Sequence, residues 1–494
     1  MGFATSAGAQ PAPDAQPPPP PPSSTDQPST AGTGTAGSEA PAKAGGEGTG
    51  GSEAPKTTDQ TPPDGAKAKE AEPKVGPPPP ITWHGITVYG TVDVSLAHLT
   101  HGAPLSNTYP PSLPFVLQNY SNRPITSFSN NGLSQSKLGL SGSEPLGVLD
   151  LKGLFRLETG FQPTSGRLAD GPKSLVDNNG VALANRLSSG DSGRAGQALN
   201  GVAFVGVGSS MLGTLTLGRQ NTIMADDLTK YDPQLQSQSF SPIGYSGTSG
   251  GFGDTEDKTL DDSAKYVLSH GPVHVAGLVQ AGRHGYEPEG AWSVGAGAEV
   301  AGLSVDVVYG KIFGAIAATS LNAMQNMTAP GTLAATISDN TGYAIMASYT
   351  MKPVKLYAAY EHMKFENPKD PLAAGSVTIG GYVLSTVNNT AYNIAKVLQY
   401  AWGGARVSVT PELELSAAYY YFNQNSFNAN GCTDNTATSC SGTFQDFSAV
   451  ADYKLTRRFD VYAGINYTTG ANGLVSGFLN TSNIATLAGL RFNF

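Results

Sequence analysis

The feature that most constrains the fold is an alternation of apolar and polar residues. It recurs in segments of about ten residues from residue 85 to the end of the chain. In GITVYGTVDVSLAHL (85–99), for example, Ile86 and Val88 share one parity, and Thr87 and Tyr89 share the other. A β-strand has a side-chain period of two, so such residues point to opposite faces of a sheet. Each segment therefore predicts a strand with one apolar and one polar face.

Sixteen such segments occur, and short joints between them alternate with long polar insertions. The segments are 85–99, 134–144, 149–162, 197–209, 212–220, 262–270, 272–283, 291–300, 302–314, 341–352, 354–366, 396–409, 411–424, 444–456, 458–469 and 484–494. The long insertions are 221–261, 315–340 and 367–395. An even number of strands, with short turns at one end and long loops at the other, is typical of an up-and-down barrel across an outer membrane. The parity of 355–365 is ambiguous.

The apolar faces decide between a soluble sheet and a membrane barrel. A soluble sheet turns its apolar face toward a core. Here the apolar faces consist mostly of Ala, Gly, Val, Leu and Tyr, and the polar faces carry charged residues in mid-strand. A spanning helix is excluded, because it needs about 18 or more consecutive apolar residues and no such stretch occurs. We predict an all-β fold, a 16-stranded antiparallel transmembrane β-barrel; a soluble β-rich adhesin is the alternative.

The C-terminal stretch LAGLRFNF fits the end of such a barrel. Phe494, Phe492 and Leu490 share one parity, and Asn493 and Arg491 share the other. We expect the phenylalanines to face lipid as part of an aromatic girdle. The last strand is expected to pair with the first, because closure removes both sheet edges.

Residues 1–80 have a different composition from the rest of the chain. They contain 18 of the 35 prolines and only one aromatic residue, Phe3. Such a segment favours polyproline II and flexible coil, so we predict that 1–80 is disordered and that 81–494 is the barrel. The start lacks the charged and apolar regions of a secretory signal. The formal net charge of -9, with no basic patch, argues against a nucleic-acid partner.

Few residues suggest any other chemistry. Cys432 and Cys440, the only cysteines, would close a small disulfide loop in an oxidising compartment. His98 and His101 form an H-x-x-H pair, but we expect no metal site there. GTSGG (247–251) matches G-x-S-x-G without the strand and helix that a nucleophile elbow requires. No cofactor, metal or catalytic constellation is expected, although a barrel enzyme remains a rival hypothesis.

Several segments resemble the trimeric general porins of Gram-negative outer membranes. They are ITVYGTVDVSL, SKLGLSGSEPLGVLDLKGLFRLETGFQ (136–162), VAFVGVGSSMLGTLTLGRQ (202–220), SAKYVLS (263–269) and the terminal GLRFNF. The resemblance covers residues 81–494. It implies an outer-membrane location in contact with lipid and lipopolysaccharide, a homotrimer, and a terminal Phe494 that the barrel-assembly machinery reads. It also implies that the third long loop, here 221–261, folds into the lumen.

The resemblance and strand parity together suggest which residues line the channel. The resemblance implies an acidic loop facing a basic wall, and loop 221–261 contains Asp226, Asp227, Asp232, Asp254, Glu256, Asp257 and Asp261. We predict that the first three, with Lys137, Arg156 and Glu158, form the constriction. The Pro-Glu-Phe-Gly-Gly turn of enteric porins has no clear match. By parity the wall residues that face the lumen are Lys137, Lys152, Arg156, Glu158 and Lys265; Arg406 joins them unless Gly403 and Gly404 form a bulge. Arg219 has lipid-facing parity and resembles a subunit contact.

These expectations combine into a passive channel. An acidic loop opposite a basic wall would produce a transverse field that admits ions and small hydrophilic solutes and slows apolar ones. The barrel's net charge of -5 (24 basic and 29 acidic residues) favours cations weakly. A substrate-selective channel is an alternative. Another is a tether in which residues 1–80 reach the cell wall, although the same tail fits a spacer without a partner equally well.

Overall fold

The structure, a computed structural model, describes the barrel region of the chain in most of its length. The described residues are 76, 78–101, 123–182, 185, 196–243, 249–253, 258–283, 287–375, 378–379, 381–428, 440–475 and 480–494. Ala71–Phe494 is one compact unit. The prediction of disorder for residues 1–80 lies almost wholly outside the described residues.

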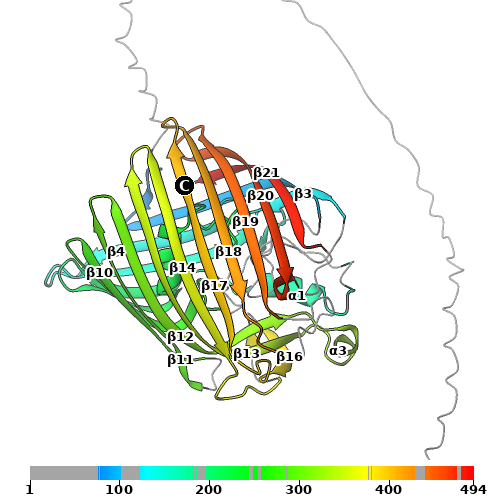
Figure 1. Cartoon of the computed structure of the whole chain (residues 1–494). Coiled ribbons are helices and arrows are strands. Elements are labelled where there is room, and N and C mark those ends of the chain that lie inside the picture. The colour runs from blue at the N-terminus through cyan, green and yellow to red at the C-terminus, as the bar shows by residue number, and fades with distance from the viewer. Residues whose placement is uncertain are drawn as a thin grey trace, which may run out of the picture. The chain divides into compact units, whose positions relative to one another are not determined.

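Sixteen antiparallel strands form a closed barrel (Figure 1). They are β2 (Ile86–Leu99), β4 (Lys137–Pro145), β5 (Lys152–Gln162), β7 (Ala203–Ser209), β8 (Gly213–Asn221), β9 (Thr259–His270), β10 (Val273–Arg283), β11 (Glu287–Val300), β12 (Leu303–Thr319), β13 (Leu333–Met351), β14 (Val354–Glu366), β17 (Lys396–Ser408), β18 (Leu413–Gln424), β19 (Gly442–Lys454), β20 (Phe459–Asn472) and β21 (Ser482–Asn493). Each strand pairs with the next along this series, and β21 pairs with β2. The predicted sixteen-stranded barrel is confirmed.

The remaining elements pair with the barrel strands or lie in the loops. They are β1 (Ile81–Trp83), β3 (Ile125–Asn130), β6 (Arg167–Leu168), β15 (Thr378–Ile379), β16 (Tyr382–Asn388), α1 (Gly171–Asp177), α2 (Ile223–Tyr231), α3 (Ala323–Thr328) and η2 (Gly473–Val475). None of the helices in the described part of the chain is long and apolar enough to cross a membrane.

The predicted loop 315–340 is wrong in part, because β12 continues to Thr319 and β13 begins at Leu333. With 17 and 19 residues, these two strands are the longest of the barrel, and α3 lies between them in the chain. Ile316 and Ile337 from this extension pack with Leu175 of α1 and with Leu384 of β16. Loop packing that is invisible in the sequence therefore stabilises the longer strands.

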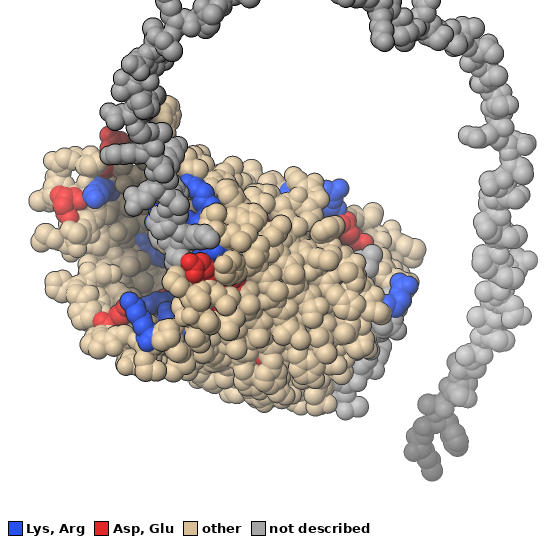
Figure 2. All heavy atoms as spheres, turned by 90° about the horizontal axis from the view of Figure 1, so that it is seen from above, with Lys and Arg blue, Asp and Glu red and all other residues tan. Residues whose placement is uncertain are grey.

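The apolar faces of the wall point outward. Val307 of β12 is 48% exposed, whereas its neighbour Asp306 is 1% exposed. The ambiguous parity of β14 resolves in the same way, with Leu356 outward and Glu361 and Met363 inward. In Figure 2 the flank of the barrel is almost free of charged side chains, which lie around its hollow end and, in smaller number, at the opposite end. The outer surface is thus suited to hydrocarbon.

The two ends of the barrel sequence close the wall. Phe494 and Gly90 exchange two backbone hydrogen bonds of 3.0 Å. The Phe494 ring lies where a side chain at position 90 would begin, since a Cβ on Gly90 would come within 2.4 Å of that ring. Phe492 is 39% exposed on the outer face, and its ring centroid lies 6.1 Å from that of Phe494. The predicted pairing of the last strand with the first is confirmed.

Candidate functional site

The segment between β8 and β9, residues 222–258, is called the inner loop here, and it enters the lumen immediately. It is slightly shorter than the predicted loop 221–261, because β9 begins at Thr259. Thr222 caps α2 by accepting a hydrogen bond from the Ala225 amide at 3.0 Å. Met224 and Leu228 of α2 are fully buried in the core inside the barrel, together with Val308 of β12. The apolar side of this short helix therefore fixes it to the inner wall.

After α2 the inner loop follows the wall formed by β17 and β18. The Trp402 indole donates a hydrogen bond to the Tyr231 carbonyl at 3.1 Å, and Arg406 donates to the Pro233 carbonyl at 2.8 Å. Gly403 and Gly404 form no bulge, because both pairings of β17 continue through these residues without a register shift, and Arg406 keeps its predicted inward orientation. Gly404 instead makes room for the loop: a Cβ there would lie 2.7 Å from the Pro233 ring.

Asp232, the residue of the inner loop that follows α2, is buried against β18 and does not face the channel. It is 0% exposed. Its carboxylate accepts hydrogen bonds from the amides of Gln234 at 3.0 Å and Gln236 at 2.8 Å and from the Tyr420 hydroxyl at 2.5 Å. Burial raises the pKa of Asp232. The structure therefore places this predicted constriction residue where it organises the turn after α2 and a solute cannot touch it.

The tip of the inner loop meets a second inward segment, residues 131–136, which links β3 to β4. Ser237 donates to the Gly132 carbonyl at 2.8 Å, and Gln238 donates to the Gln135 side chain at 3.0 Å. The inner loop thus crosses the lumen from β8 to the closing seam of the barrel.

Asp93 of β2 holds the segment 131–136 in place. Its carboxylate accepts the amides of Gly132, Leu133 and Ser134 at 3.2, 2.9 and 2.8 Å, and the Tyr462 hydroxyl at 2.5 Å. Sequence reasoning did not identify Asp93 as a site residue, although its polar parity was visible.

Arg491 adds a charge network beside this seam. It forms ion pairs of 3.0 Å with Asp452 and Asp460 and donates to the Ser134 hydroxyl at 2.9 Å. Its parity in the terminal strand was the available signal, but its partners depend on how β19, β20 and β21 align.

Three of the predicted wall residues come together. Lys137 and Arg156 form ion pairs with the same oxygen of Glu158 at 3.1 and 3.2 Å. Arg156 also donates to the Tyr89 hydroxyl at 2.7 Å, and that hydroxyl lies 3.4 Å from Glu158. The carboxylate is 4% exposed, whereas the two cationic side chains are 30% and 43% exposed. The cations reach water, and the acid is enclosed between them.

The acids of α2 lie beside cations. Asp226 forms an ion pair with Lys265 of β9 at 2.7 Å, and Lys230 of α2 pairs with Asp306 of β12 at 3.0 Å. Asp306 also accepts from the Tyr231 hydroxyl and contacts His274 of β10. The wall therefore pairs with one acid, Asp226, and one cation, Lys230, of α2.

Asp227 is the exception among these acids, because its half-buried carboxyl forms no ion pair with any residue in the described ranges. Burial raises the pKa of Asp227 to about 7, and repulsion from Asp306 and Asp226 adds to the shift. Lys230 and Lys265 lower the pKa in part. This loop carboxyl therefore changes its charge near neutral pH.

The other predicted residues lie apart from these groups. Lys152 is exposed at the short-turn end of β5. Cys440 is disulfide-bonded, and Cys432 lies outside the described residues, as do Asp254, Glu256 and Asp257. Arg219 is 7% exposed and pairs with Asp261 at 2.8 Å. Within the described ranges no group of three His, Cys, Asp or Glu residues could hold a metal ion.

Comparison with known proteins completes the description. The family model described as Gram-negative porin matches residues 65–473. No curated protein matches the chain. The structure is similar to an anion-selective porin from Comamonas acidovorans, with 16% identity, a TM-score of 0.52 and coverage of 83% of this chain and 99% of that one. It is also similar to in-vitro folded OmpT, an outer membrane protein of Vibrio cholerae, with 14% identity, a TM-score of 0.51 and coverage of 84% and 99%.

Proposed function

Because the chain belongs to the family of Gram-negative porins, we infer that its inner loop sets the narrowest cross-section of a water-filled channel. The protein is an outer-membrane β-barrel that lets ions and small hydrophilic solutes cross by passive diffusion. The width of the lumen at the inner loop limits which solutes cross.

The observation that carries the proposal is the set of bonds that pin the inner loop inside the barrel. The loop is fixed to β17 through Arg406 and to the closing seam through Ser237. On its return, the Phe252 carbonyl accepts from Asn340 of β13 at 2.7 Å, and the Phe252 ring fills the space over Gly342. A loop bonded on three sides of the lumen obstructs part of the cross-section permanently.

Charged thiol reagents test this arrangement directly. Leu235 lies at the turn of the inner loop and is 46% exposed inside the barrel, whereas Leu415 is 41% exposed on the outer face. We expect a negatively charged reagent to lower the single-channel conductance of Leu235→Cys by roughly half, because the added group occupies water in the narrow zone. Leu415→Cys is the matched control and should conduct unchanged. Equal responses of the two variants would rule out the loop as the constriction.

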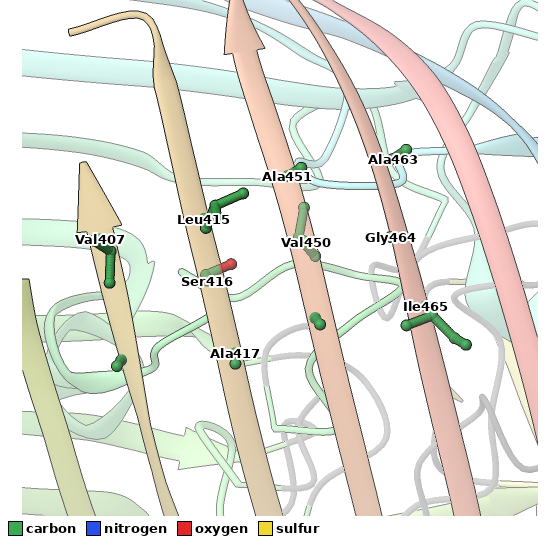
Figure 3. A pocket seen from close by; sticks show the side chains of 11 residues that line it. Val407, Leu415, Ser416, Ala417, Val450, Ala451, Ala463, Gly464 and Ile465 are labelled. Carbon is green, nitrogen blue, oxygen red and sulfur yellow. The ribbon is translucent and has the colours of Figure 1, made fainter. Parts of the chain in front are cut away.

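The outer surface supports contact with outer-membrane lipid. A shallow hollow of about 540 Å³ crosses β17 to β20 and is lined by Val407, Leu415, Ala417, Ala463 and Ile465, among others (Figure 3). Small side chains between larger apolar ones leave room for acyl chains. Spin labels at 415 and 461 should be quenched by lipid-soluble relaxing agents; protection from them would contradict this assignment.

We propose that the channel has no enzymatic activity. The Ser of the G-x-S-x-G match, Ser249, is fully buried, and its hydroxyl donates to Glu361 of β14 instead of facing an imidazole. An esterase assay of the refolded protein should give only background hydrolysis.

Assembly as a homotrimer and recognition of Phe494 by the barrel-assembly machinery are proposed from the family membership. A heat-sensitive oligomer on unboiled gels, of three chains by light scattering, would support the trimer. Deleting Phe494 should reduce insertion in cells, since it removes the ring over Gly90 and the signal together. A cell-wall contact by residues 1–80 is a proposal that pull-down of the tail with peptidoglycan would test.

A further inference from the structure

Two cations lie side by side on the inner wall without a shared carboxylate. Lys355 of β14 and Arg406 of β17 are direct partners in the register of these strands. Both face the lumen: Arg406 donates to the inner loop at Pro233, and Lys355 has the parity of the buried Tyr357, opposite to the exposed Leu356. Like charges that are directly opposite on a sheet repel each other. An arrangement of this kind needs a compensating partner.

The protein supplies that partner to Arg406 but not to Lys355. Arg406 forms an ion pair with Glu414 of β18. Lys355 forms no ion pair with any residue that the structure describes, and its ammonium lies 5.0 Å from the centroid of the Tyr357 ring. The charged groups that act on Lys355 are the cations Arg406 and Lys230 and one carboxylate, Glu299 of β11. Glu299 exerts the largest of these charge effects, yet it forms no ion pair with Lys355 in the described structure, so the ammonium remains open to a solute anion.

The position of Lys355 gives solutes access to it. It is the second residue of β14, directly after the tight turn 352–353, and its side chain is half-exposed. In this topology the short turns lie on the periplasmic side. The two cations thus lie between the periplasmic mouth and the inner loop, where water reaches Lys355 and the Arg406 side chain is 14% exposed.

We propose that Lys355 and Arg406 form a binding station for small hydrated anions at the periplasmic mouth of the channel, and that Lys355 determines anion access. The ammonium of Lys355 and the guanidinium of Arg406 supply hydrogen-bond donors to an anion, whereas the neighbouring Lys230 is paired with Asp306. The inference rests on the proposed channel function and adds a selectivity determinant on β14 and β17, away from the Lys137–Arg156 wall. Chloride is the probe, because its permeability relative to potassium follows from one reversal potential.

The test compares two lysines that are three residues apart. Lys355→Met should lower the chloride-to-potassium permeability ratio in a KCl gradient by about threefold, the effect of one unit charge about 7 Å from the ion path in water, and Lys355→Glu by about tenfold. Lys355→Arg should keep the native ratio. Lys352→Met is the control, since Lys352 lies exposed in the turn outside the lumen, and it should leave the ratio unchanged.

The outcomes separate this inference from the function on which it rests. A Lys355→Met channel with native conductance and a native permeability ratio would overturn the binding station and leave the porin function intact. A refolded native protein that forms no channels would overturn both. Native heat-modifiability on gels, expected for Lys355→Met because the change removes a repulsive charge, shows that the variant is folded.

Discussion

Two cationic sites on the inner wall contain the same kinds of side chain but differ in the acid between them. Lys137 and Arg156 share the enclosed carboxylate of Glu158. Lys355 and Arg406 share none among the described residues, where Glu414 pairs with Arg406 and Lys355 forms no ion pair. The first site is a three-member cluster with one net positive charge, and the second is a pair of adjacent cations with an acid on one side only.

The comparison teaches that the charge felt by a permeating ion is local. The barrel's formal charge of -5, from 24 basic and 29 acidic residues, includes carboxylates that solutes cannot reach, such as Asp232 and Asp93, which are both 0% exposed. Counting them overstates the attraction for cations. Cations that reach water, such as Arg156 and Lys355, act on a permeating ion at shorter range. They therefore influence ion selectivity more than the formal net charge of the barrel does.

The largest effect is expected from removing both cations of the first site. In the double variant Lys137→Met, Arg156→Met, the carboxylate of Glu158 loses both ion pairs. The formal charge of the wall becomes more negative by two. The potassium-to-chloride permeability ratio should rise by about tenfold, about threefold for each charge. Reversal potentials in a KCl gradient measure it. Lys352→Met, in the exposed turn before β14, is the control; an unchanged ratio in the double variant would remove the cluster from the ion path.

Neutralising Glu158 should change the permeability ratio in the opposite direction and by a smaller factor. Glu158→Gln keeps an acceptor for Arg156 but adds one positive unit, so the first site comes to resemble the second. Chloride permeability relative to potassium should rise by about threefold. If the ratio instead falls, the two cations do not face the channel water.

Titration of Asp227 in the inner loop should make the ion preference of the channel depend on pH. Because the pKa of Asp227 is raised to about 7, the group is charged at pH 8 and mostly protonated at pH 6. Acidification therefore removes a negative charge from the inner loop, and the preference for potassium should fall by up to about twofold, since neighbouring charges and water screen the site. Reversal potentials between pH 8 and 6 measure this, and Asp227→Asn should give a flatter curve. An equally steep curve in that variant would assign the titration to another group.

The smallest effect concerns the hydrogen bond that orients Arg156. Tyr89→Phe removes the hydroxyl that accepts from Arg156 at 2.7 Å without changing any charge. We expect about 1 kcal/mol lower free energy of unfolding and less than about twofold change in selectivity. Thermal unfolding in detergent and reversal potentials provide the two readouts. A large change in selectivity would mean that the position of Arg156, rather than its charge, controls ion passage.

Strand parity predicted the wall but not the interior packing. Alternation identified all sixteen strands and the inward orientation of Lys137, Arg156 and Lys265. It could not show that Met363 and Tyr420 fill the lumen side, because apolar residues are expected there only when an inner loop packs against them. That packing also explains why the parity of β14 was ambiguous.

The sequence by itself determined which side of each strand meets water, because a period of two is a local property of an extended chain. Only the tertiary structure decided which charges meet. Asp93 and the Tyr462 hydroxyl that it binds are 369 residues apart, and Lys355 opposes Arg406 only through the register of β14 with β17. Ion pairs and hydrogen bonds form over a few ångströms, and such distances follow from closure of the barrel and from the path of the inner loop, which no local pattern encodes.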